Sequence, residues 1–232
     1  MLKPKSPAPE QSSPIGAAVT DDKPLSRRAY EAIFAAIQDG QLSPGSLVRE
    51  TDLTEWLEMS RTPLRDALQR LEAQGLLRLQ SHRGILISTL DRPAVTELYT
   101  AREWAEGAAA SLAARHATAA DVAQMQHILA LEREAAGDPA LGARYNRTLH
   151  RAIYDCTRNR YLIEHLMGLS ALLALVGNAT RRNPQRVEEA LREHTALVAS
   201  IGEGNAQRAE DCARQHIQSA QRFVLNNRVT DE

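Results

Sequence analysis

The chain of 232 residues has only two cysteines, Cys156 and Cys212, and no apolar run as long as a membrane span, which needs about 20 residues. Two cysteines do not form a disulfide framework, and the lysines near the N-terminus are not followed by the apolar segment of a secretory signal. We therefore expect a cytoplasmic protein that does not contact a membrane, in which both cysteines are packing residues.

Aromatic residues are also scarce. They make up 4% of the chain, whereas 43% of the residues are hydrophobic, with alanine and leucine dominant. This composition favours packed helices over a β-sandwich. An excess of positive charge is missing as well, because the net charge is −1 and residues 23–90 carry nine Lys and Arg against eight Asp and Glu. Composition alone therefore gives no indication of nucleic-acid binding, which would depend on where the charges lie.

The N-terminal part of the chain is expected to contain an arm and two helices. Residues 1–24 are rich in proline and serine and poor in large apolar side chains, which predicts a disordered arm. A first helix is expected over residues 25–40, with Ser26 as its cap. A second, shorter helix is expected over residues 50–57, with Trp56 turned inward.

The next stretch, residues 60–72, predicts a helix with one apolar face and one basic face. A hydroxyl of Ser60 or Thr62 can cap its first turn. Arg61 and Arg65 are four residues apart and therefore share a face. Such a helix can pack on a domain with one face and enter a DNA groove with the other. A solvated helix with two ordinary surface arginines has the same pattern, so the neighbouring elements have to decide between these interpretations.

Two short β-type runs follow, on either side of a polar turn that contains Gly84. A hairpin directly after the second helix of a helix-turn-helix is typical of a wing. His82 and Arg83 at its tip could reach a phosphate or the minor groove. The order of elements therefore favours the DNA-binding interpretation of residues 60–72.

The string SRTPLRDAL at residues 60–68, followed by RLE at residues 70–72 and by Gly75, resembles the winged-helix domain of the GntR family of bacterial transcription regulators. The resemblance covers about residues 25–90. It implies a homodimer that binds palindromic, double-stranded operator DNA with its recognition helices in the major groove. The DNA-binding residues expected on this basis are Arg61, Thr62, Pro63, Arg65, Arg70, His82, Arg83 and Gly84.

From residue 91 onward the sequence predicts only helices, separated by Thr118, Asn159 and several Gly or Pro breaks. The expected spans are 91–116, 118–136, 139–158, 160–181, 184–202 and 204–227. The predicted fold class is therefore mainly α. A winged helix-turn-helix of three helices plus a β-hairpin wing (residues 25–90) is followed by an all-α bundle of six to seven helices (residues 91–228).

Three histidines of this bundle, His150, His194 and His216, lie on three different predicted helices and could bring their imidazoles to one point. Asn146 is four residues before His150 and shares its face. Imidazoles with an oxygen ligand suit Zn²⁺ or Ni²⁺. The sequence separations of 44 and 22 residues match no short zinc motif, so ordinary polar histidines explain the spacing equally well.

The NRTLH string at residues 146–150, with EH at 193–194 and ARQH at 213–216, resembles the FCD sensor domain of the FadR subfamily. The resemblance covers about residues 93–225. It implies a divalent metal ion, zinc before nickel or another ion, bound by Asn146, His150, His194 and His216. It also implies a small carboxylate effector that completes the metal shell. The effector-binding residues expected on this basis are Arg102, Tyr99 and Glu106.

Three functions agree with these patterns. The first is a transcription regulator, either a repressor or an activator, that responds to a small ligand. The second is a metal sensor in which the ion itself is the signal. The third is a zinc hydrolase, because three histidines with an open coordination position also occur in catalytic sites. No HExxH-type arrangement is present, so we expect the first function and no enzyme.

Overall fold

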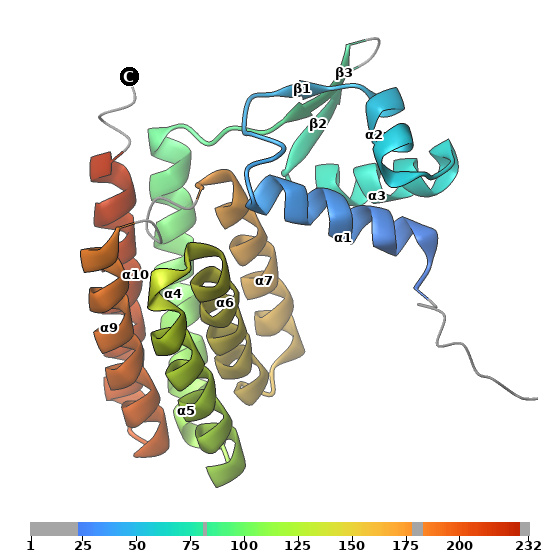
Figure 1. Ribbon diagram of the computed structural model, residues 1–232. Coiled ribbons are helices and arrows are strands. Elements are labelled where there is room, and N and C mark those ends of the chain that lie inside the picture. Colours follow the sequence, from blue (N-terminus) through green and yellow to red (C-terminus); the bar gives the residue numbers. More distant parts are fainter. Residues whose placement is uncertain (1–22, 81–82, 178–182, 228–232) are drawn as a thin grey trace, which may run out of the picture.

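The computed structural model describes residues 23–80, 83–177 and 183–227. A small domain with helices and a sheet sits at one end of a bundle of long helices (Figure 1). Most of the predicted arm at residues 1–24 and the predicted contact His82 lie outside the described residues, as do residues 178–181 of the helix predicted over 160–181.

The small domain has three helices, α1 (Leu25–Gln38), α2 (Glu50–Leu57) and α3 (Arg61–Ala73). Strands β2 (Leu77–Gln80) and β3 (Gly84–Ile87) form the predicted hairpin. A third, unpredicted strand, β1 (Leu47–Val48), pairs antiparallel with β3, so that the strand order is β1-β3-β2. The winged helix-turn-helix is therefore confirmed. The apolar faces of the helices and sheet share one core, which includes Ile33, Leu64, Leu68, Leu71 and Ile85.

Three local expectations for this domain are wrong. Helix α1 begins at Leu25 after Pro24, so Ser26 lies inside the helix instead of capping it. Ser60 does occupy the N-cap position of α3, but its side chain makes no capping hydrogen bond. Trp56 is 48% exposed. Helix α2 has only two turns, and Leu53 with Leu57 fills its contact with the core, which leaves the indole outside.

The bundle is all-α, as predicted. It contains α4 (Arg92–His116), α5 (Ala119–Glu134), α6 (Pro139–Cys156), α7 (Arg160–Leu172), α9 (Pro184–Gly202) and α10 (Ala206–Asn227), with short 3₁₀ turns η1 (Ala135–Gly137) and η2 (Leu173–Leu175). Asp91, Thr118, Asp138, Asn159 and Asn183 each accept a hydrogen bond from a first-turn N–H of the helix that follows. In the described part of the chain, no helix combines the length and apolar character that a membrane crossing requires.

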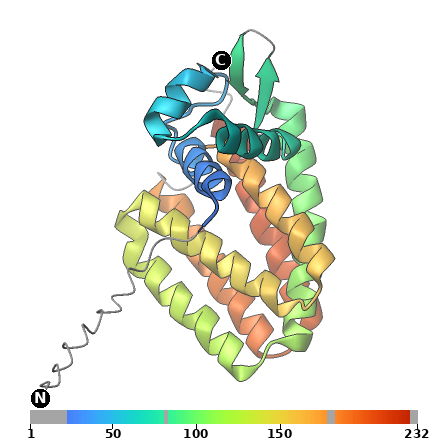
Figure 2. The ribbon, with the colours of Figure 1, turned by 90° about the vertical axis from the view of Figure 1, so that its right-hand side faces the viewer.

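The end of α7 differs from its prediction and joins the two domains. The predicted helix over residues 160–181 ends at Leu172 and continues as η2, before Gly177 takes a left-handed φ of +86°. Ala171, Ala174 and Leu175 of this segment belong to the same hydrophobic core as the winged domain. Figure 2 shows this end of the bundle beneath the small domain. The two domains therefore share a continuous apolar contact.

Candidate functional site

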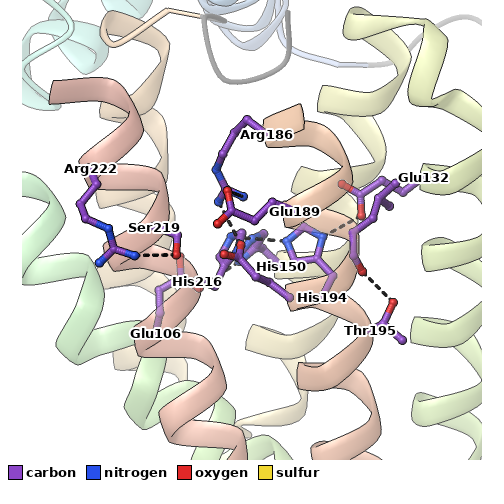
Figure 3. Close-up of polar contacts among 12 residues, drawn as sticks. Glu106, Glu132, His150, Arg186, Glu189, His194, Thr195, His216, Ser219 and Arg222 are labelled. Atoms are coloured by element: carbon purple, nitrogen blue, oxygen red, sulfur yellow. Dashed lines mark hydrogen bonds and ion pairs between the residues drawn. The ribbon is translucent and has the colours of Figure 1, made fainter. Parts of the chain in front are cut away.

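Three histidine rings meet inside the bundle, each from a different helix (Figure 3). His150 lies on α6, His194 on α9 and His216 on α10, and all three are buried. One ring nitrogen from each lies within 4.8 Å of the others, and Nε2 of His194 is 3.4 Å from Nε2 of His216. The fold thus brings together residues that are 44 and 22 positions apart in the sequence.

Each of these rings has a glutamate on its Nδ1 side. The Nδ1-to-carboxylate distances are 2.9 Å for His150 and Glu106, 2.8 Å for His194 and Glu132, and 2.7 Å for His216 and Glu193. An ionised carboxylate can only accept a hydrogen bond, so we assign the ring proton to Nδ1 in every case. The Nε2 lone pairs then point away from the carboxylates, as in histidines that bind a metal through Nε2.

The charge state of His216 fits the same arrangement. Burial lowers the pKa of His216 well below its ordinary value, and the neighbouring His194 and His150 act in the same direction. A neutral His216 directs its Nε2 lone pair at that of His194, 3.4 Å away. A divalent cation between the rings would relieve this repulsion, and a donor set of imidazoles suits zinc.

A cavity of about 80 Å³ borders the histidine cluster. Its walls include His150 and His216 together with Asn146, Tyr99 and Arg102. Asn146 and two of the three predicted effector residues therefore face the same space as two of the histidines.

Two arginines line this cavity, and both are almost fully buried: Arg102 is 5% exposed and Arg186 is 4% exposed. Arg102 donates a hydrogen bond to Glu106, and Arg186 donates to Glu189 and Glu193. The Nε atoms of both arginines nevertheless have no hydrogen-bond partner among the described residues. Because a buried unsatisfied donor is unfavourable, each of the two Nε–H groups requires an acceptor from outside the described residues, such as water or a bound ligand.

Glu106, the third predicted effector residue, lies behind His150 instead of among the cavity-lining residues of the described chain. Its carboxylate accepts hydrogen bonds from Arg102 (2.7 Å) and from the hydroxyl of Tyr154 (2.8 Å). Burial alone would raise the pKa of the Glu106 carboxyl, but His150 and Arg102 hold it well below its usual range. This position suits a residue that orients His150 and Arg102 more than one that contacts an effector.

Sequence reasoning missed Arg186 as a site residue. A signal was available, because Arg186 lies on the buried face of α9 with Ala190 and His194, which follow it at helical spacing. A charged side chain on such a face usually has a specific partner. Glu132 gave the same signal, because it follows Met125, Ile128 and Leu129 at helical spacing on the buried face of α5. The spacing does not show that it faces a histidine on α9.

The predicted DNA-reading face of α3 is open to solvent. Arg61, Thr62 and Arg65 are exposed, whereas Pro63 in the first turn is half-buried. Arg83 is exposed beside the wing strand β3. The basic and the apolar side chains of α3 thus lie on opposite faces, which is the arrangement that docking into a groove requires.

Two other residues predicted to bind DNA, Arg70 and Gly84, contact other elements of the winged domain. The guanidinium of Arg70 lies 4.8 Å from the ring centroid of Tyr30, on α1. Gly84 has a φ of +109°, and a Cβ at this position would lie 2.6 Å from the carbonyl oxygen of Val48. Only glycine fits where β3 approaches β1, so the pairing of these strands already explains this residue.

Comparisons with known proteins agree with both parts of the fold. Residues 25–87 match the family described as bacterial regulatory proteins, gntR family, and residues 97–219 match the FCD domain. The chain is 30% identical over 129 residues to the Nta operon transcriptional regulator of Aminobacter aminovorans, which covers 55% of this chain and 61% of that protein. It is 26% identical over 175 residues to the uncharacterized HTH-type transcriptional regulator YdhC of Bacillus subtilis, which covers 74% and 78%.

Solved structures of regulators share the fold. E. coli McbR/YncC matches with a TM-score of 0.80 and 22% identity, over 88% of this chain and 99% of that chain. A putative GntR regulator from Rhodococcus sp. RHA1 matches with a TM-score of 0.71 and 21% identity, over 87% and 97%. The FCD match alone covers more than half of the chain, and the relatives are regulators, not enzymes. The chain therefore belongs to the GntR family of DNA-binding transcription regulators and carries a C-terminal FCD domain.

Proposed function

We propose that this regulator binds a palindromic operator as a homodimer, and that a small carboxylate metabolite bound beside a divalent metal in the FCD domain changes its affinity for DNA. The observation that carries the proposal is the meeting of three histidine rings beside a cavity that is also lined by two incompletely hydrogen-bonded, buried arginines. The two-fold symmetry of the sites that helix-turn-helix regulators read supports a homodimer.

Asn146, His150, His194 and His216 would hold the metal ion. Three neutral imidazoles favour zinc, with nickel as the second candidate. The bound ion supplies positive charge and an open coordination position, both of which attract an anionic ligand. The amide oxygen of Asn146 adds no charge of its own, so the ion keeps more of its attraction for an anion than it would beside a fourth, carboxylate ligand.

The charges around the site support a monoanionic effector. Arg102 and Arg186 contribute two positive charges, and Glu106, Glu132 and Glu193 contribute three negative charges. This buried set therefore has a net charge of −1, which a divalent ion converts to +1. A monocarboxylate would then neutralise it, so metal binding should strengthen effector binding.

The short turn η2 supports a route from the cavity to the DNA-binding domain. Leu173 lines the cavity, whereas its neighbours Ala174 and Leu175 belong to the hydrophobic core of the winged domain. A ligand that displaces Leu173 would shift residues on which α1 of the winged domain packs, because packed cores transmit small movements. The effector could thereby change the disposition of the recognition helix α3.

Replacing Arg65 by alanine should weaken operator binding by about 5-fold to 150-fold, because one bidentate contact to a base contributes about that much discrimination. A gel-shift titration with the DNA upstream of the protein's own gene measures the effect. Arg27→Ala is the matched control, because Arg27 is an exposed arginine on α1, paired with Glu31. Equal operator affinity of Arg65→Ala and wild type would exclude α3 as the reading helix.

The ligand response is tested by measuring operator affinity for the metal-free protein, the zinc-loaded protein, and the zinc-loaded protein with each of a panel of small carboxylates. We expect a change of about 5-fold to 150-fold only when zinc and one carboxylate are both present. Leu173→Ala should still bind both ligands but respond more weakly. A full response to zinc alone would instead identify a metal sensor without an organic effector.

A further inference from the structure

The exposed guanidinium of Arg65 is already held by a second residue of the DNA-binding domain. Nε of Arg65 lies 2.9 Å from Oε1 of Glu50, and the terminal nitrogen Nη2 of Arg65 lies 3.4 Å from Oε2 of the same carboxylate. The Arg65 side chain is 61% exposed and that of Glu50 is 31% exposed. Because exposed ion pairs contribute little to stability, a role in folding does not account well for this two-point contact.

The geometry of the pair determines which donors of Arg65 remain for another partner. A guanidinium has five N–H groups in one plane, and the carboxylate of Glu50 occupies the edge formed by Nε and Nη2. The edge formed by the two terminal nitrogens faces away from Glu50. Two parallel N–H donors in a fixed plane match O6 and N7 of guanine in the major groove.

The backbone of Glu50 is held in place by the start of a helix. Glu50 is the first residue of α2, where its negative charge also interacts favourably with the helix N-terminus. Both residues border a hollow of about 340 Å³ between α3 and the wing, together with Gln69 and Gln80. The ion pair thus spans α2 and α3 beside the surface on which a DNA groove would lie.

We propose that Glu50 is a positioning residue for base recognition, which orients Arg65 so that its terminal nitrogens read one guanine of the operator. The inference rests on the DNA-binding function described above. Without the carboxylate, the long side chain of Arg65 samples other rotamers and can also bind phosphates, which carry no sequence information. Loss of Glu50 should therefore reduce sequence discrimination more than it reduces overall attraction to DNA.

The test compares the full-length wild type with Glu50→Gln, Arg65→Ala and the double variant. Wild-type protein first selects its preferred sequence from a pool of random duplex DNA. Affinities are then measured for the selected duplex and for duplexes in which each guanine is replaced in turn by adenine. Glu55→Gln is the matched control, because Glu55 is an exposed glutamate of the same helix α2, and circular dichroism confirms that all variants are folded.

Arg65→Ala should lose discrimination at one base pair, and Glu50→Gln should lose about 5-fold or more of the discrimination at that same base pair. The double variant should lose no more than Arg65→Ala, and Glu55→Gln should discriminate as the wild type does. The inference would be overturned if Glu50→Gln discriminated as the wild type does, because the ion pair would then have no effect on recognition. It would also be overturned if Glu50→Gln bound every duplex more tightly by the same factor, because the ion pair would then only inhibit DNA binding. If the wild type itself selects no sequence, the sequence-specific function fails and the inference fails with it.

Discussion

Replacing Arg102 by methionine is expected to lower the free energy of unfolding of the metal-free protein by about 3 to 5 kcal/mol. Arg102 and Glu106 form a buried ion pair of 2.7 Å, with side-chain exposures of 6% and 4%. Without Arg102 the ionised carboxylate would keep, among the described residues, His150 and Tyr154 as partners. Methionine fills similar space but supplies no charge, so the penalty is that of an uncompensated buried carboxylate. Urea denaturation measures it.

Two controls separate this effect from a general loss of packing. Arg192→Met removes an arginine from an exposed ion pair with Glu188 and should cost less than about 0.5 kcal/mol. The double variant Arg102→Met, Glu106→Gln should recover most of the lost stability, because no ionised carboxylate then remains unpaired. A double variant that is as unstable as Arg102→Met alone would show that the loss comes from shape and not from charge.

The winged domain could be predicted from sequence because its signals are local. The apolar spacing and the string at residues 60–68 lie within a few turns of the elements that they define. Strand β1 could not be predicted in this way. It has only two residues, and its partner β3 follows after almost forty residues, so no local alternation marks it.

The histidines of the site could be predicted from the sequence, but the hydrogen bonds between them and the carboxylates could not. The resemblance to FCD domains identified His150, His194 and His216, but the partners of their Nδ1 atoms come from three other positions on α4, α5 and α9. Helical periodicity shows which residues share a face of one helix and contains no information on which helices face each other. The partners of the carboxylates and of Arg186 could therefore be assigned only from the packed bundle.

Loss of one histidine of the cluster is expected to abolish metal uptake under conditions in which the wild type binds one zinc ion. Calorimetric titration of metal-free protein measures the affinity. His216→Ala removes one of three converging nitrogens, whereas Glu132→Gln only weakens the hydrogen bond to Nδ1 of His194 and should cost about 10-fold to 100-fold. His127→Ala, at an exposed position of α5, should bind as the wild type does.

A substitution of Asn146 tests metal binding and effector binding together. If its side-chain oxygen faces the ion, Asn146→Asp should bind zinc more tightly, because a carboxylate adds a negative charge at the same position. The same substitution should weaken carboxylate binding, because it removes the net positive charge that we expect the metal to create around Arg102 and Arg186. Opposite changes in zinc affinity and carboxylate affinity would therefore show that the side chain of Asn146 lies close to both ligands. Unchanged zinc affinity in Asn146→Asp would leave the three histidines as the only protein ligands among these four residues.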